Sequence, residues 1–181
     1  MESLYKQEYD ISNIQENVEM VVYSSVCFFI PFLMGHPQLL VGTLVNASLI
    51  LGSLNLKSHK LLPVIILPSI GVLSKGAIFG PFTIFLLYMV PFIWIGNFIL
   101  VFAFKKFNLQ LKLNKWLTLL IGAAMKTAFL FIIALVLVKL DILPPIFTTT
   151  MGLFQFYTAI LGGILALGIH GLKKKGLEKY K

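Results

Sequence analysis

The chain has 181 residues, of which 58% are hydrophobic and 12% charged, with a formal net charge of +8. Soluble domains carry about 25% charged residues, so this composition and a mean hydropathy of +0.91 exclude an ordinary soluble protein. All fifteen strongly basic residues are lysines. They flank apolar runs, where lysine side chains contact anionic lipid headgroups. The sequence therefore predicts contact with membrane lipid and no nucleic-acid partner.

Six apolar runs each approach the roughly 20 residues that span a bilayer. If both termini are cytoplasmic, only Lys75 and Lys139 fall outside, and Lys126 falls within a span. Since cytoplasmic loops carry an excess of lysine, the sequence predicts an all-α, multi-pass plasma-membrane protein with six transmembrane helices and cytoplasmic termini. The twelve lysines predicted inside are Lys6, Lys57, Lys60, Lys105, Lys106, Lys112, Lys115, Lys173, Lys174, Lys175, Lys179 and Lys181.

The predicted elements form one domain with polar ends. Residues 1–16 are a polar cytoplasmic segment, 17–172 the six-helix transmembrane domain, and 173–181 a basic cytoplasmic tail. Ser12 and Gln15 fit a capping box that starts the first helix.

Short loops join the predicted spans. Tight outside turns are expected at 35–37 and 75–81, and the fourth span is expected to end at Lys105 in a basic inside loop. The third span contains Pro63 and Pro68, so we expect it to be broken. The predicted spans are about 18–34, 38–54, 61–76, 82–104, 116–138 and 147–172.

Lys126 is the principal candidate for a functional residue. It lies near the middle of the fifth span, where a charge costs roughly 2.5–3.5 kcal/mol to insert. No acidic residue lies in a predicted span core to pair with it, because Asp141 belongs to an outside loop. One interpretation is a counter-charge for an anionic solute. The alternative is a lysine that reaches the headgroups or loses its proton beside small neighbours.

Several aromatic and polar residues are expected near the same depth. Trp94 and Lys126 lie equally far from the outer ends of the fourth and fifth spans, so they can share one layer. A few polar groups in an apolar wall are typical of a small-molecule pocket. Besides Lys126, the candidate substrate-binding residues are Trp94, Asn97, Tyr88, Gln155 and Tyr157.

Enzyme chemistry is not expected. The histidines at 36, 59 and 170 are too dispersed for one metal site, and no hydrolase, zinc-protease or nucleotide-binding motif is present. We therefore predict no catalytic residue, no metal site and no cofactor.

The middle of the chain resembles the substrate-binding S components of energy-coupling factor (ECF) transporters. The stretches are LPSIG at 67–71, Gly80-Pro81, and MVPFIWIGN at 89–97. The resemblance implies a small membrane protein that captures a vitamin or metal ion from outside. Such a protein then associates with an ECF transmembrane coupling subunit and cytoplasmic ATPases. By that analogy Trp94, Asn97, Lys126 and Gln155 line the pocket.

The metal-binding branch of that family has a histidine directly after the initiator methionine, and this chain has Glu2 there. We therefore expect a small, vitamin-like, anionic solute rather than a metal ion. The rival interpretation is a non-catalytic structural subunit of a larger membrane complex, in which Lys126 meets a partner's carboxylate. A stand-alone facilitator is a third possibility.

Overall fold

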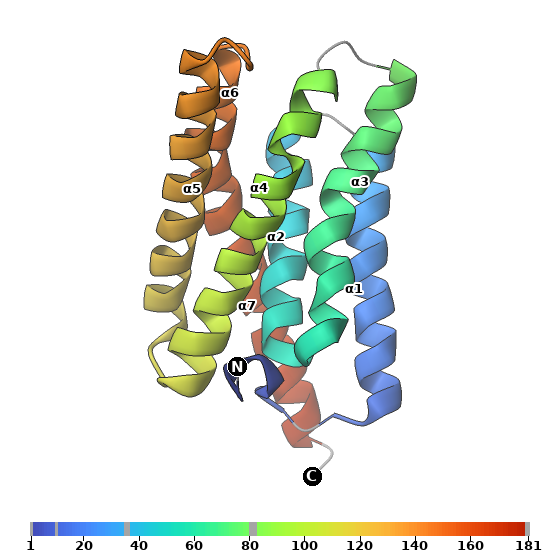
Figure 1. Ribbon diagram of the computed structural model, residues 1–181. Coiled ribbons are helices and arrows are strands. Elements are labelled where there is room, and N and C mark those ends of the chain that lie inside the picture. The colour runs from blue at the N-terminus through green and yellow to red at the C-terminus, as the bar shows by residue number, and fades with distance from the viewer. Residues whose placement is uncertain (1, 10, 35–36, 80–82, 180–181) are drawn as a thin grey trace.

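The computed structural model describes residues 2–9, 11–34, 37–79 and 83–179, and within these ranges the chain is helical without strands. Residues 35, 36, 80 and 81 of the predicted turns, and Lys181 of the predicted tail, lie outside the described residues. The main helices form an up-and-down bundle (Figure 1). They are α1 (Asn13–Leu33), α2 (Gln38–Asn55), α3 (Leu62–Phe79), α4 (Thr83–Ala103), α5 (Lys115–Lys139), the short α6 (Ile146–Met151) and α7 (Leu153–Lys179).

Five helical stretches among the described residues are long and apolar enough to cross a membrane. The described residues are therefore all-helical, and these five stretches are consistent with the membrane protein that the composition predicts. The third span, predicted at 61–76, corresponds to α3, which is not among these five. The five candidate spans are Asn13–Leu33, Gln38–Asn55, Ile84–Gln110, Lys115–Lys139 and Ile146–Lys174.

The two ends of the bundle differ in charge. Both termini lie at the same end (Figure 1). We call it the basic end, and it carries the described lysines Lys6, Lys57, Lys60, Lys105, Lys106, Lys112, Lys115, Lys173 and Lys174. The opposite end holds the α1–α2, α3–α4 and α5–α6 connections, with Lys75 and Lys139.

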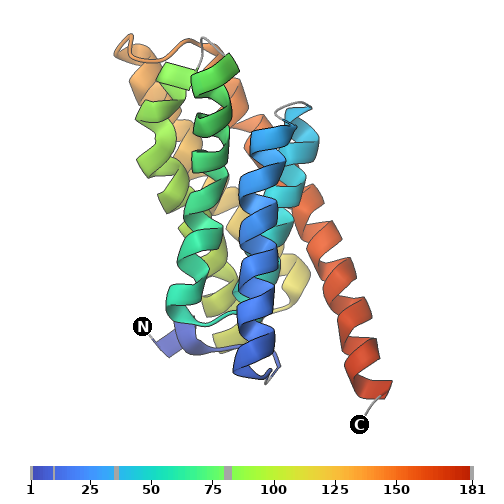
Figure 2. The ribbon, with the colours of Figure 1, turned by 90° about the vertical axis from the view of Figure 1, so that its right-hand side faces the viewer.

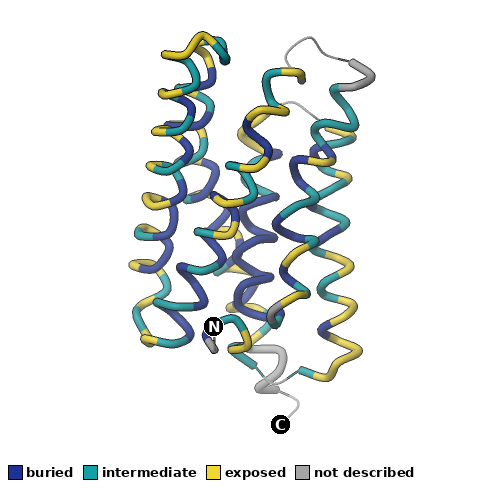
Figure 3. The backbone as a smooth tube through the Cα atoms, in the orientation of Figure 1, coloured by how far each residue is buried: buried dark blue, intermediate teal, exposed yellow. Residues whose placement is uncertain are grey.

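Helix α2 is the centre of the bundle. Its second half, from Val45 to Asn55, is buried on all sides (Figure 3). Small residues on α2 and α7 let these two helices pack closely. A Cβ at Gly162 of α7 would lie only 2.7 Å from the carbonyl oxygen of Thr43 on α2. Toward its end α7 leans away from the other helices (Figure 2).

Several helix boundaries can be compared with the predicted ones. The capping box is confirmed, since the Ser12 hydroxyl accepts from the Gln15 backbone N–H at 3.2 Å, and α1 begins at Asn13. The predicted break in the third helix is wrong. Pro63 lies in the first turn of α3, where a missing N–H costs little, and the helix continues through Pro68.

The predicted end of the fourth helix agrees with α4, which ends at Ala103, but the loop expected from Lys105 onward is wrong. The helix continues as a π-helical segment, η3 (Phe104–Gln110), which turns the Lys105 side chain into the bundle instead of a loop. The predicted sixth helix is interrupted at Gly152, which separates α6 from α7.

The segment before α1 folds under the basic end. A short 3-10 turn, η1 (Glu2–Tyr5), is followed by Glu8, whose backbone N–H donates to the carbonyl of Leu54 on α2 at 2.9 Å. Lys105 is fully buried and donates to the backbone carbonyls of Lys6 and Leu56. The polar N-terminal segment is thus part of the packed structure and closes this end.

Candidate functional site

A cavity of about 510 Å³ lies inside the half of the bundle nearer the opposite end. At the basic end the corresponding space is filled by an apolar core that includes Leu49, Leu54, Val64 and Phe104. The cavity opens at the opposite end, where the exposed residues Gln38 and Ile146 belong to its lining. Its described lining is Pro31, Gln38, Val41, Gly42, Val45, Asn46, Pro68, Ser69, Val72, Lys75, Leu86, Ile93, Asn97, Lys126, Ile146, Phe147, Thr150, Met151, Phe154, Gln155 and Thr158.

The ammonium group of Lys126 forms the deep end of the cavity. Lys126 is only 2% exposed, so its side chain does not reach the headgroup layer. Its Nζ donates to Asn46 Oδ1 on α2 at 2.6 Å and to Asn97 Oδ1 on α4 at 2.9 Å. An ammonium has three donors, so one remains for a molecule in the cavity.

Both asparagines are held with their oxygens toward Lys126. The Asn46 Nδ2 group donates to the carbonyl of Gly42 at 2.9 Å and to Thr158 Oγ1 at 3.1 Å. The Asn97 Nδ2 group donates to the carbonyl of Ile65 on α3 at 3.0 Å. Since each amide nitrogen has an acceptor elsewhere, each amide oxygen is left for the lysine. Four helices thereby fix the position of the cation.

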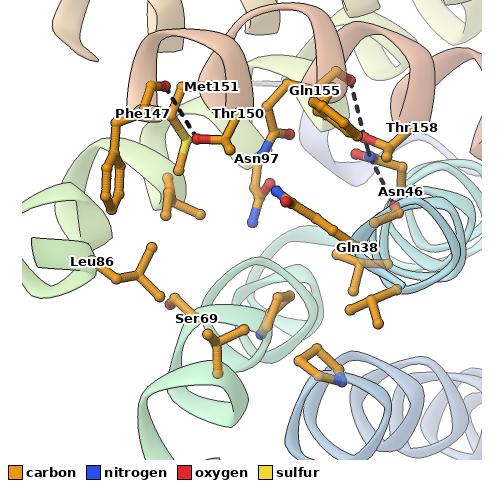
Figure 4. A pocket seen from close by; sticks show the side chains of 18 of the residues that line it. Gln38, Asn46, Ser69, Leu86, Asn97, Phe147, Thr150, Met151, Gln155 and Thr158 are labelled. Atoms are coloured by element: carbon orange, nitrogen blue, oxygen red, sulfur yellow. Dashed lines mark hydrogen bonds between the residues drawn. The ribbon is translucent and has the colours of Figure 1, made fainter. Parts of the chain in front are cut away.

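Two glutamines supply further polar groups. The side chains of Gln38 on α2 and Gln155 on α7 reach into the same space as Asn97 (Figure 4). Neither glutamine side chain has a hydrogen-bond partner among the described residues. Each amide therefore offers both a donor and an acceptor to a bound molecule.

One wall of the cavity is apolar. Leu86 and Ile93 of α4 pack in one apolar cluster with Phe147 and Met151 of α6, and all four line the cavity. The break at Gly152 lets α6 turn independently of α7. Few polar groups against such a wall are typical of sites that orient a small molecule.

The structure places the predicted site residues in three different positions. Lys126, Asn97 and Gln155 line the cavity together. Trp94 does not line it, but its Nε1 donates to Ser69 Oγ, a lining residue, at 2.6 Å. Trp94 therefore holds the Ser69 side chain in position without lining the cavity itself.

Two predicted residues lie away from the cavity. Tyr88 is 54% exposed and Tyr157 is 56% exposed on the outer surface of the bundle, and neither belongs to the described lining.

Sequence reasoning missed Asn46, Gln38 and Lys75. Asn46 had a detectable signal, because it is a strongly polar residue in the middle of an apolar span, where such residues face the protein interior. Gln38 and Lys75 had none, because they lie at helix ends where polar residues are expected.

The described lining contains no carboxylate, histidine or cysteine. Nor do the described residues contain a group of three or more histidine, cysteine or acidic side chains that could hold a metal ion. The arrangement can bind and orient a molecule through one cation and several amides.

The chain matches no protein-family model, no curated protein and no solved structure.

Proposed function

We propose that the protein is a membrane solute-binding component, of the ECF S-component type, that captures a small anionic micronutrient from outside the cell. The supporting observation is a cavity of about 510 Å³ whose deepest polar group is a buried ammonium with no carboxylate partner among the described residues. Such a cation is costly in a bilayer, and an anionic solute would lower that cost.

The proposed orientation follows from the charge of the two ends. With the basic end in the cytoplasm, six spans cross the plasma membrane and the cavity opens to the outside. Energy for import would come from a separate coupling subunit and ATPases, since the sequence contains no nucleotide-binding motif.

Thermal unfolding of the purified protein in detergent tests for a solute. A panel of vitamins and their acidic precursors should contain a compound that raises the unfolding temperature. Stabilisation should follow RT ln(1 + [L]/Kd), which is about 2.7 kcal/mol at a hundredfold excess over Kd. Lys126→Ala should weaken this binding, whereas Lys139→Ala, at an exposed position outside the cavity lining, should not. Binding that is equal in both variants would contradict the role of Lys126.

Co-purification tests the rival, a structural subunit of a larger membrane complex. The rival expects Lys126 to meet a carboxylate of another chain, but the burial of Lys126 and its bonds to Asn46 and Asn97 do not favour that contact. Capture of ECF-type ATPases from native membranes would favour the importer. Capture of an unrelated membrane complex, with no solute binding, would favour the rival.

A further inference from the structure

We propose that the solute is an elongated molecule with an acidic group at each end, one bound by Lys126 and the other by Lys75. The inference rests on the proposed function and specifies the substrate class of the same cavity. The observation behind it is that this lining contains two lysines and, among its described residues, no carboxylate.

Neither cavity lysine is neutralised within the described chain. Lys126 donates to two amide oxygens, and Lys75 Nζ donates to the backbone carbonyl of Leu33 at 3.0 Å. At the basic end, three lysines on η2 (Ser58–Leu61), α5 and α7 pair directly with carboxylates, in the pairs Lys60–Glu16, Lys115–Glu8 and Lys173–Glu19. Lys105 at the same end donates to backbone carbonyls. The two lysines that line the cavity likewise have no carboxylate partner among the described residues, and they leave two positive groups there.

The two ammonium groups lie at opposite ends of the cavity. Lys75 Nζ is bound at the end of α1, beside the start of α2 at Gln38. Lys126 Nζ is bound to Asn46, just over two turns further along α2, which is about 12 Å at 1.5 Å per residue. Each charge-assisted hydrogen bond takes up about 2.8 Å, so roughly 6 Å or more remains between the two acidic groups of the solute.

The space between the lysines suits an apolar linker. Val72 of α3, Leu86 and Ile93 of α4, and Met151 of α6 line it. The amides of Gln38 and Gln155 can add hydrogen bonds to the acidic groups. A compact dianion would be too short to reach both lysines. A fatty acid has only one acidic group, so it too would leave one lysine without an anionic partner.

A length series of α,ω-dicarboxylates tests this. Succinate, adipate, suberate and sebacate would be titrated into the detergent-purified protein by calorimetry, each beside the monocarboxylate of the same chain length. We expect the affinity to peak at an intermediate length, with the best dicarboxylate binding at least about tenfold tighter than its monocarboxylate, or about 1.4 kcal/mol.

Lys75→Met should remove the advantage of the dicarboxylate and leave monocarboxylate affinity unchanged. Lys126→Met should weaken both. Lys139→Met, at the same end of the bundle but outside the lining, is the matched control. Because Lys75 is partly exposed, its replacement should leave the fold intact, and this variant decides the matter even if Lys126→Met fails to fold.

Three results would overturn the inference without touching the proposed function. The first is equal affinity for matched mono- and dicarboxylates, and the second is a dicarboxylate preference that survives Lys75→Met. Failure of every acid, while another compound from the vitamin panel binds, would overturn it in the same way. Absence of any bound solute together with absence of ECF-type partners would instead defeat the proposed function.

Discussion

The contact of Lys126 with two asparagines decides what the cavity can recognise. A carboxylate at position 46 or 97 would have neutralised the ammonium, and the cavity would no longer attract an anion. Amide oxygens satisfy the geometry of the N–H donors but leave the net charge in place. The site therefore combines a fixed cation position with a remaining attraction for an anion.

Replacing Asn97 by alanine should destabilise the protein by about 1–3 kcal/mol, because Lys126 loses a buried acceptor and the Ile65 carbonyl loses a donor. Thermal or chemical unfolding in detergent measures the loss. Asn17→Ala, at an exposed position on α1, is the control and should change stability by less than about 0.5 kcal/mol. Equal losses of stability in the two variants would show that the hydrogen bonds of Asn97 with Lys126 and Ile65 do not stabilise the fold.

Helical periodicity explains which site residues could be predicted from the sequence. The cost of a mid-span charge predicted that Lys126 faces the interior, and its burial confirms this. Tyr88 and Asn97 are two and a half turns apart on one helix, so they must point to opposite sides. Choosing residues by depth alone put Tyr88 and Tyr157 beside Lys126. Depth combined with helical phase would have separated them.

At the scale of elements, the close pairing of α2 with α7 positions one side of the cavity. Gly42 lies against Thr158, the residue that accepts from Asn46. Gly162, one turn further along α7, lies against the backbone of α2. Without these small residues α7 could not bring Thr158 and Gln155 to the cavity.

Gly162→Ala should therefore lower stability by about 1–3 kcal/mol, because a Cβ there would lie 2.7 Å from the Thr43 carbonyl oxygen and 2.8 Å from the Ala47 nitrogen, both backbone atoms. Gly168→Ala on the same helix is the control. A Cβ at Gly168 meets nothing within 4 Å, so this change should be neutral or stabilise the helix by up to about 1 kcal/mol. Unfolding midpoints in detergent distinguish the two, and similar midpoints would mean that α2 and α7 separate easily.

The helix boundaries that the sequence did not predict depend on distant contacts. Local signals placed the start of α1 correctly, through Ser12 and Gln15. The helical segment extends past Lys105 because that lysine donates to two backbone carbonyls, one from the N-terminal segment and one from Leu56, directly after α2. Those acceptors are about 50 and 100 residues away, so no local pattern around Lys105 could have indicated them.

On the scale of the whole molecule, ion pairs hold the basic end together. Glu8 lies between α5 and α7, with Lys115 Nζ at 2.5 Å and His170 Nε2 at 3.1 Å. Glu16 holds both the Lys60 ammonium at 2.8 Å and the Lys57 backbone N–H at 2.7 Å. Charge counting predicted many lysines at this end, but not that acidic residues of the first helix and the N-terminal segment would pair with them.

The stability of the fold should depend on pH through Glu8. Burial raises the pKa of its carboxyl, but His170 and Lys115 outweigh this effect and lower the pKa to about 2, from an ordinary value of 4.5. Because the folded-state value is the lower one, Glu8 stabilises the fold fully above about pH 4.5. This contribution is lost as the pH falls from 4.5 toward 2.

Unfolding temperatures measured in a pH-tolerant detergent from about pH 7 down to about pH 2 cover this window together with a neutral reference. Glu8→Gln should flatten the acid limb of the curve and lower stability at neutral pH. Asp141→Asn, in an exposed position at the opposite end, should reproduce the wild-type curve. If Glu8→Gln loses stability at low pH as the wild type does, the acid dependence comes from groups other than Glu8.

The link between Glu8 and His170 has a consequence for biosynthesis. Glu8 precedes the main helices of the bundle and His170 lies in α7, so Glu8 leaves the ribosome well before its partner. The N-terminal segment therefore has no docking surface on α7 until α7 itself has been synthesised. Truncated nascent chains that already contain α1 to α5 could form the Glu8–Lys115 pair and the bond of Glu8 to Leu54, but not the contact with His170. The Glu8–His170 contact is therefore a marker that α7 has joined the bundle.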